Sequence, residues 1–120
     1  MKPKIIRILL ADDNPALRSA LALLLETRLN ARIVGEAYSM DELLSSVSLT
    51  HPDVVILDWE LPGVPRWDRV AALRETDPDL KIVITSSRPE VAQKALAAQA
   101  DAYISKSEPP ERMVQMLREM

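Results

Sequence analysis

The chain has 120 residues, 48% of them hydrophobic and 28% charged, and its 15 basic and 18 acidic side chains give a formal net charge of -3. This length predicts one domain over residues 1–120, and the slightly acidic charge provides no basic surface for direct binding of nucleic acid. The longest apolar runs are far too short to cross a membrane and the N-terminus carries no cleavable signal, so we expect a cytoplasmic protein.

Five short runs rich in isoleucine and valine alternate along the chain with longer segments of helical period. Their continuous hydrophobicity is typical of parallel strands covered on both faces, and the more mixed second run is expected nearer an edge. The predicted strands are Ile5–Ala11, Ile33–Ala37, Val54–Leu57, Ile82–Thr85 and Ala102–Ser105.

A segment whose apolar residues recur at helical spacing follows each predicted strand. The first helix is expected to begin at Asn14-Pro15. The second is expected at the capping box Ser39-Met40-Asp41-Glu42, in which the serine oxygen accepts from a free amide and the glutamate reaches back. The third helix is predicted at Asp68–Glu75, the fourth after Pro89 and the fifth after Pro109-Pro110.

Five strand–helix units predict an α/β architecture, a flavodoxin-like three-layer (βα)5 fold with a doubly wound parallel sheet of strand order 2-1-3-4-5. In sheets of this order a ligand binds outside the carboxyl ends of the strands, at the crevice between strands one and three. We therefore expect the functional residues where the strands end.

Polar residues follow four of the predicted strands, and a parallel sheet brings them to one edge. They are Asp12-Asp13, Asp58, Thr85-Ser86 and Ser105-Lys106. Three neighbouring carboxylates repel one another unless a cation neutralises them. Cysteine is absent and His51 is the only histidine, so a magnesium site built from oxygen ligands fits this edge better than a zinc site.

A divalent ion at this edge would screen the charges that oppose attack of a carboxylate on a phosphoryl group. Asp58 is the predicted nucleophile because it ends the most hydrophobic strand, which holds its backbone rigidly. Lys106 and Ser86 offer an ammonium and a hydroxyl group to phosphoryl oxygens. Gly35 and Gly63 are too far apart to form a phosphate-binding glycine loop.

Four segments resemble, in order and spacing, the receiver domain of two-component response regulators. They are LLADDNPALRSALALLL, PDVVILDWELPG, KIVITSS and ADAYISKSEPPE, and the likeness covers essentially the whole chain. The stretch KSEPPE resembles receivers that precede a helix-turn-helix output. The resemblance implies a signalling domain, not an enzyme, that takes part in its own Mg²⁺-dependent phosphorylation and dephosphorylation.

The resemblance also implies a role for each residue of the site. Asp58 is the phosphoacceptor and Lys106 the family's lysine. Mg²⁺ would be bound directly by Asp13, Asp58 and the backbone carbonyl of Glu60, and through water by Asp12. The phosphoryl group would come from a sensor histidine kinase or a phosphotransfer protein.

Ser86 matches the switch hydroxyl of the family and Tyr103 its rotating aromatic residue. Charge on the phosphorylated Asp58 would draw Ser86 toward it and let Tyr103 turn inward, which alters the surface of the fourth helix, fifth strand and fifth helix. That face is also a candidate homodimer contact. Thr85 becomes the switch residue if the predicted strand end is wrong by one position, and the alternative for Tyr103 is a half-buried strand aromatic.

Three features depart from the family pattern. Gln99 stands where a glycine usually ends the fourth helix, so we expect local strain or a different termination. Ser107-Glu108 separates Lys106 from Pro109, whereas the family has a cis proline directly after the lysine. Residues 64–67 replace a small flexible turn with a bulkier one at the lip of the metal site.

Glu60 and Arg88 follow the phosphoacceptor and the switch serine by two residues, where the family tunes the lifetime of the phosphoryl group. We expect these side chains to pair across the site and to obstruct the water that attacks the phosphoryl group.

Two other functions use similar residues. A phosphatase of the haloacid dehalogenase type has its nucleophile before the acid pair and usually an inserted cap domain, and this chain has the opposite order and no length for a cap. A pseudo-receiver that binds proteins without phosphorylation is favoured only by the departures above. Asp12-Asp13 alone would be read as a helix cap, but Asp58 and Lys106 at matching strand ends favour the metal site.

Overall fold

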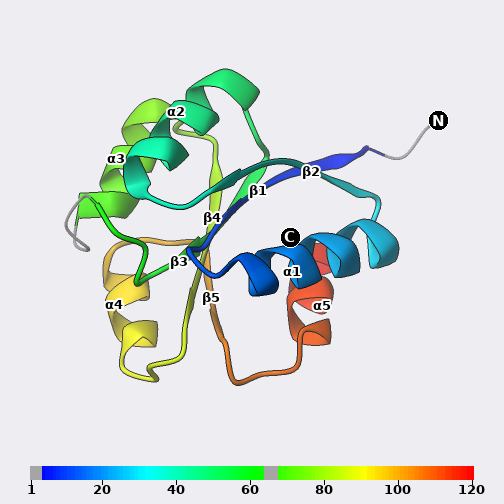
Figure 1. The fold of residues 1–120 in the computed structure, drawn as a ribbon. Coiled ribbons are helices and arrows are strands. Elements are labelled where there is room, and N and C mark those ends of the chain that lie inside the picture. The colour runs from blue at the N-terminus through cyan, green and yellow to red at the C-terminus, as the bar shows by residue number, and fades with distance from the viewer. Residues whose placement is uncertain (1–3, 64–67) are drawn as a thin grey trace.

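Five parallel strands form one sheet in the order β2-β1-β3-β4-β5 in the computed structural model, which describes residues 4–63 and 68–120 (Figure 1). The strands are β1 (Ile6–Ala11), β2 (Ala31–Ala37), β3 (Val54–Asp58), β4 (Lys81–Ser86) and β5 (Ala102–Ser105). The predicted flavodoxin-like fold and its strand order are confirmed. Because β1 and β3 are neighbours and the chain winds outward from them in both directions, their carboxyl ends flank the crevice of the sheet.

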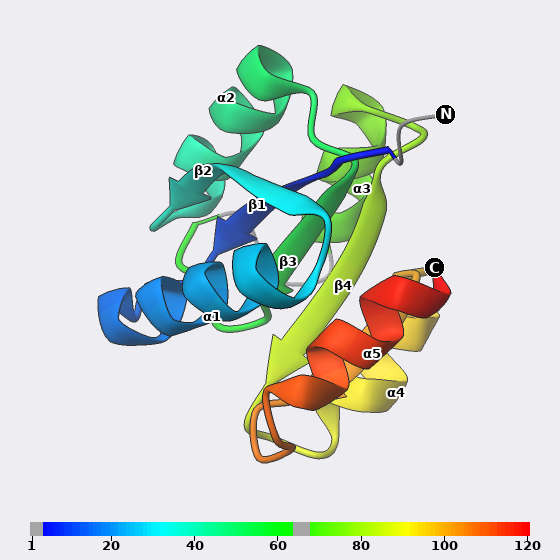
Figure 2. The ribbon, with the colours of Figure 1, turned by 90° about the vertical axis from the view of Figure 1, so that its right-hand side faces the viewer.

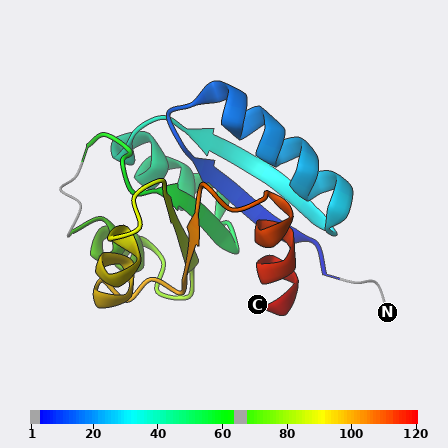
Figure 3. The same ribbon diagram turned by 90° about the horizontal axis from the view of Figure 1, so that it is seen from below.

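Five helices cover the two faces of this sheet, as Figures 2 and 3 show. They are α1 (Pro15–Arg28), α2 (Met40–Thr50), α3 (Arg69–Thr76), α4 (Val91–Ala97) and α5 (Glu111–Glu119). Helices α2, α3 and α4 pack on one face, and α1 and α5 pack on the other. No helix in the described part of the chain is long and apolar enough to span a membrane.

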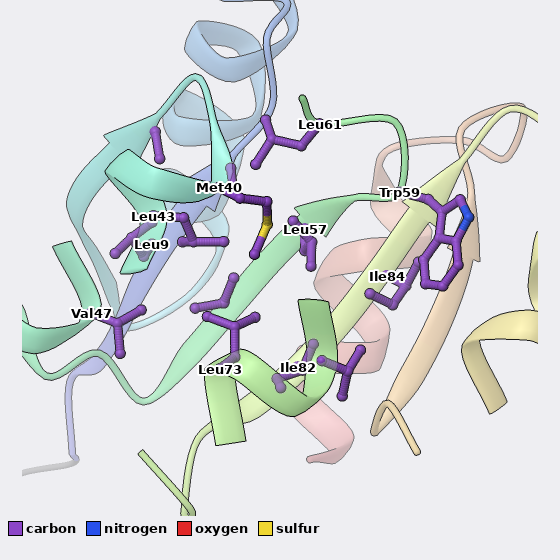
Figure 4. Close-up of a cluster of buried hydrophobic side chains, with 14 of the residues drawn as sticks. Leu9, Met40, Leu43, Val47, Leu57, Trp59, Leu61, Leu73, Ile82 and Ile84 are labelled. Atoms are coloured by element: carbon purple, nitrogen blue, oxygen red, sulfur yellow. The ribbon is translucent and has the colours of Figure 1, made fainter. Parts of the chain in front are cut away.

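The core has two halves because successive residues of a strand point to opposite faces. Leu9 of β1 and Leu57 of β3 belong to the core beneath α2, α3 and α4, whereas Ile8 and Ile56 belong to the core beneath α1 and α5. Figure 4 shows the half of the core on the α2–α4 side, in which Met40 of α2 packs against Leu9 and Leu57. The central strands are therefore covered on both faces and hold the residues at their ends in fixed positions.

Side chains cap the first two helices as the sequence predicts. The Asn14 side chain accepts a hydrogen bond from the Leu17 N–H at 3.1 Å, so it is the N-cap of α1. At the start of α2, Ser39 Oγ accepts from the Glu42 N–H at 3.3 Å, and the Glu42 carboxylate accepts from the Tyr38 N–H at 2.5 Å. The alternative that Asp12-Asp13 caps α1 is wrong, because Asn14 occupies that position.

Candidate functional site

The predicted site residues meet at the carboxyl edge of the sheet. Asp58 is the last residue of β3 and Ser86 the last of β4, while Asp12 and Lys106 directly follow β1 and β5. Asp58 is 3% exposed and Asp12 is 5% exposed. Two of the three predicted carboxylates are therefore buried at the end of a hydrophobic sheet, where an uncompensated negative charge is costly.

Oxygen atoms of Asp12, Asp13 and Asp58 lie within 4.8 Å of one another. The donors are all hard oxygen atoms, which is the chemistry that Mg²⁺ prefers. Burial raises the pKa of Asp58 above its usual range, although the N–H of Glu60 and the ammonium of Lys106 act in the opposite direction. A divalent cation fits this cluster because it would offset both the burial and the mutual repulsion of the carboxylates.

Lys106 lies between two of these acids. Its Nζ is 2.9 Å from Asp12 Oδ2 and 3.1 Å from Asp58 Oδ2. Burial alone would lower the pKa of Lys106, but the hydrogen bonds to Asp12 and Asp58 and the negative charges of these carboxylates together raise it. The lysine is therefore a fixed cation that contacts the predicted phosphoacceptor directly.

The two residues that separate Lys106 from Pro109 do not take the lysine out of the site. No cis peptide bond occurs in the described residues. The loop is instead a hydrogen-bonded turn, in which Ser105 Oγ contacts Ser107 Oγ at 2.7 Å and the Glu108 N–H donates to the Ser105 carbonyl at 3.1 Å. The Lys106 N–H also donates to the carbonyl of Ser86 at 2.9 Å, which ties this loop to the end of β4.

The two hydroxyl residues at the end of β4 have different surroundings. Ser86 is fully buried, and its Oγ accepts a hydrogen bond from the Arg88 N–H at 3.1 Å. Thr85 lies opposite Asp58 in the β3–β4 register and lines the same cavity as Lys106. Because side chains alternate along a strand, Thr85 and not Ser86 shares its side of the sheet with Asp58. The register therefore sets Thr85 opposite Asp58, whereas Ser86 lies on the side of the sheet that Tyr103 packs on.

Tyr103 of β5 is half-buried, and its hydroxyl contacts the loop that follows β4. It donates to the carbonyl of Ser86 at 3.3 Å or to that of Arg88 at 3.2 Å. The side chain thus connects β5 to the segment that leads into α4. Any inward turn of Tyr103 would have to release these contacts.

Glu60 and Arg88 form the predicted ion pair. Arg88 donates to Glu60 Oε1 from Nε at 2.9 Å and from Nη2 at 2.6 Å. The side chains are 42% and 34% exposed for Arg88 and Glu60, so water screens this pair. The Glu60 N–H donates to Asp58 Oδ1 at 3.0 Å, which places the backbone of Glu60 against the predicted phosphoacceptor.

Two buried arginines at the edge were not predicted from the sequence. Arg18 donates from Nη1 to the carbonyl of Asp12 at 2.6 Å, and Arg69 donates from Nη1 to the carbonyl of Trp59 at 2.7 Å. Each one therefore holds the backbone beside a predicted site residue. The signal in the sequence was an arginine on the apolar face of a helix, since Arg18 precedes Leu21 by three residues and Leu25 by seven.

The predicted lip of the metal site, residues 64–67, lies outside the described residues.

Comparisons with known proteins agree with this geometry. A family model for the response regulator receiver domain matches residues 8–118. The transcriptional activator protein ExaE of Pseudomonas putida is 35% identical over 113 residues, which cover 92% of this chain and 53% of that protein. The nitrate/nitrite response regulator protein NarL of Escherichia coli is 31% identical over 114 residues, which cover 93% of this chain and 53% of that protein. This chain thus spans about half the length of the curated relatives it matches.

Among solved structures, the chain is similar to a two-component response regulator of the LuxR family from an Aurantimonas species. The identity is 31% and the TM-score is 0.88, with 97% of this chain and 84% of that chain covered. The receiver domain of the putative response regulator NarL from Mycobacterium tuberculosis has the same fold, with a TM-score of 0.87 at 24% identity and coverage of 98% of this chain and 96% of that one.

Proposed function

Because the chain belongs to the receiver domains of two-component response regulators, we propose that it is a phosphorylation-dependent switch and that Asp58 accepts the phosphoryl group. The observation that supports this most strongly is the contact between Lys106 and Asp58, 3.1 Å apart, beside two further carboxylates. A buried nucleophile next to a fixed cation is what transfer of a phosphoryl group onto a carboxylate requires.

In the proposed reaction an oxygen of Asp58 forms a bond to phosphorus while the bond from phosphorus to the nitrogen of the donor histidine breaks. The imidazole leaves with the electron pair of that bond, and its nitrogen takes up a proton. Asp13, Asp58 and the carbonyl of Glu60 would hold Mg²⁺ directly, and Asp12 would hold it through water. Once bound, Mg²⁺ would neutralise the charge that otherwise repels a phosphate group.

The residues of the chain prepare Asp58 for this step. The Glu60 N–H holds Oδ1 and Lys106 holds Oδ2, so the carboxylate plane is fixed before a donor arrives. After transfer, the ammonium of Lys106 can move from the carboxylates to an oxygen of the phosphoryl group. The donor class we propose is a sensor histidine kinase or a phosphotransfer protein.

The output step we propose is a shift of the α4–β5–α5 face, and the same face is the homodimer contact that we propose. The shift needs a hydroxyl near Asp58 and a movable Tyr103; we propose Ser86 for the first role, with Thr85, opposite Asp58 in the β3–β4 register, as the alternative. We propose a cytoplasmic location, and partners other than nucleic acid for this domain itself.

The test of the function is intact mass after incubation with acetyl phosphate, with and without Mg²⁺. We expect one added phosphoryl group that requires Mg²⁺ and is lost in Asp58→Asn. Asp41→Asn, which makes the same change on an exposed position of α2, should be labelled like the wild type. Absence of an adduct under every condition would favour the pseudo-receiver, and steady release of phosphate without an adduct would favour a phosphatase.

The Glu60–Arg88 pair is proposed to slow hydrolysis by obstructing water. Glu60→Ala should shorten the lifetime of the phosphoryl group by up to about fivefold, because an exposed pair is worth roughly 0–1 kcal/mol. Decay of the labelled mass measures this lifetime. Glu90→Ala is the matched control, since Glu90 is exposed and belongs to the same loop as Arg88. Equal lifetimes for Glu60→Ala and the wild type would rule out this role.

The two candidate switch hydroxyls can be separated by removing each one. In the phosphorylated protein, Ser86→Ala should abolish the change in the NMR signals of the Tyr103 ring, whereas Thr85→Val should keep it, because Ser86 and not Thr85 lies on the side of the sheet that Tyr103 packs on. The reverse pattern would assign the switch to Thr85.

A further inference from the structure

Arg18 is a charged residue inside the protein. It belongs to α1, and its side chain is only 7% exposed. A buried guanidinium group is costly unless it is paired and hydrogen-bonded. Arg18 has three such contacts: Nη1 to the carbonyl of Asp12 at 2.6 Å, Nε to Glu36 Oε1 at 3.0 Å, and the ring of Tyr38, whose centroid is 4.1 Å from the guanidinium carbon.

The contact with Asp12 completes a set, because each polar group of Asp12 has a partner. Its N–H donates to the Ala37 carbonyl at 3.1 Å and its Oδ1 accepts from the Asn14 N–H at 2.9 Å. Its Oδ2 accepts from Lys106, and its carbonyl accepts from Arg18. Of these four, the Arg18 bond is the one that fixes the plane of the peptide joining Asp12 to Asp13.

Asp13 depends on that peptide for its position. The side chain of Asp13 is exposed and has no hydrogen bond or ion pair with the described residues. A peptide group is planar, so rotation of the Asp12 carbonyl would swing the backbone of Asp13 with it. The placement of the Asp13 carboxylate within 4.8 Å of Asp58 therefore depends on the backbone, which Arg18 holds before Asp13 and the Asn14 N–H bond to Asp12 holds after it.

We infer that Arg18 is a positioning residue of the metal site: by holding the carbonyl of Asp12 it sets the spacing of the Asp13 and Asp58 carboxylates around a divalent cation. The inference rests on the proposed function, since it assumes that these carboxylates bind Mg²⁺. Glu36 and Tyr38 hold the guanidinium plane from β2 and from the loop after it, so the geometry of the arginine fork matters more than its charge.

The test is the dissociation constant of Mg²⁺, measured by calorimetry on the whole chain for the wild type, Arg18→Met and Arg18→Lys. Partners that orient a metal ligand typically change metal affinity by about 10–100-fold, so we expect at least about tenfold weaker binding in Arg18→Met. Arg18→Lys keeps the charge but lacks the fork, and its binding should stay weak. Asp13→Asn should abolish binding.

A matched control separates positioning from loss of stability. Arg74 of α3 also donates to backbone carbonyls, those of Leu80 and Gln99, and pairs with Asp101. These contacts lie at the opposite end of the sheet, just before β4 and β5. Arg74→Met should therefore lower the urea midpoint and leave the Mg²⁺ dissociation constant within about twofold of the wild type.

Three results would overturn the inference. Unchanged Mg²⁺ affinity in both Arg18 variants would show that the carbonyl bond does not set the spacing. Full recovery in Arg18→Lys would show that charge, not geometry, is responsible. Failure of the wild type to bind Mg²⁺ at all would remove the proposed function and this inference together. If Arg18→Met does not fold, the comparison of Arg18→Lys with Arg74→Met decides.

Discussion

Gln99 is one of two non-glycine residues in the described part of the chain with a positive φ, the other being His51. Gln99 has φ 66°, in the left-handed region that favours glycine. The Ala100 N–H donates to the Ala95 carbonyl and the Gln99 N–H to the Leu96 carbonyl, which is the bond pattern of a Schellman motif. The strain predicted from the missing glycine is confirmed, and its form is a glutamine in the position that glycine normally takes.

Gln99→Gly should therefore stabilise the protein by about 0.5–1 kcal/mol, because it relieves the left-handed strain at a position with no need for a side chain. Urea unfolding measures the change. Gln93→Gly is the matched control: Gln93 is exposed inside α4, so the same substitution should destabilise by about 1 kcal/mol. The same sign for both variants would contradict the strain argument.

The residues at the carboxyl edge could be predicted because each one directly follows a buried apolar run. To predict that Asp58 and Lys106 belong to the site, one needs only the positions of the strand ends and the rule that the carboxyl ends of parallel strands lie at one edge of the sheet. Arg18 and Arg69 were missed because a single arginine within a helix is normally expected to face solvent. Only the packed fold shows that each one lies beside a backbone carbonyl that accepts its hydrogen bond. The choice between Thr85 and Ser86 depends on strand register, which the sequence leaves open by one residue.

At the scale of elements, the helices divide by how they begin. Helices α1 and α2 have side-chain caps, whereas α3, α4 and α5 have none. The first two could be located closely from the sequence because Asn14 and Ser39 satisfy free amides locally. The start of α3 differs from the predicted one by a single residue, as Arg69–Thr76 replaces Asp68–Glu75, since no cap fixes it.

Ser39→Ala should destabilise the protein by about 1 kcal/mol, because the Glu42 N–H at the start of α2 loses its acceptor. Ser45→Ala makes the same change at an exposed position inside α2, where alanine is the better helix former, so it should be neutral or slightly stabilising. Chemical denaturation of the two variants gives the comparison. A loss at Ser45 equal to that at Ser39 would show that capping is not the cause.

At the scale of the whole molecule, the proposed metal site predicts that Mg²⁺ stabilises the fold. A ligand that binds only the folded state at 100 times its dissociation constant adds about 2.7 kcal/mol. Urea unfolding with and without Mg²⁺, at ionic strength matched with NaCl, measures this gain. Asp13→Asn should lose the gain and Asp41→Asn should retain it. A gain that persists in Asp13→Asn would place the bound ion elsewhere.

The order of the strands was predictable from the sequence because hydrophobic runs and helical segments alternate without interruption, and right-handed crossovers leave few arrangements. What the sequence did not indicate was how the loop after Lys106 keeps the lysine in place without the expected proline. The answer is the turn built by Ser105 and Ser107, whose hydroxyl groups contact each other at 2.7 Å.

The bond between Asp12 and Lys106 joins residues 94 positions apart in the chain. A ribosome makes the acidic half of the site first and supplies the lysine only after all five strands have been synthesised. A growing chain therefore holds its carboxylates without the cation that pairs with them. The site becomes complete only when β5 docks against β4, so a complete set of site residues requires that the whole sheet has assembled.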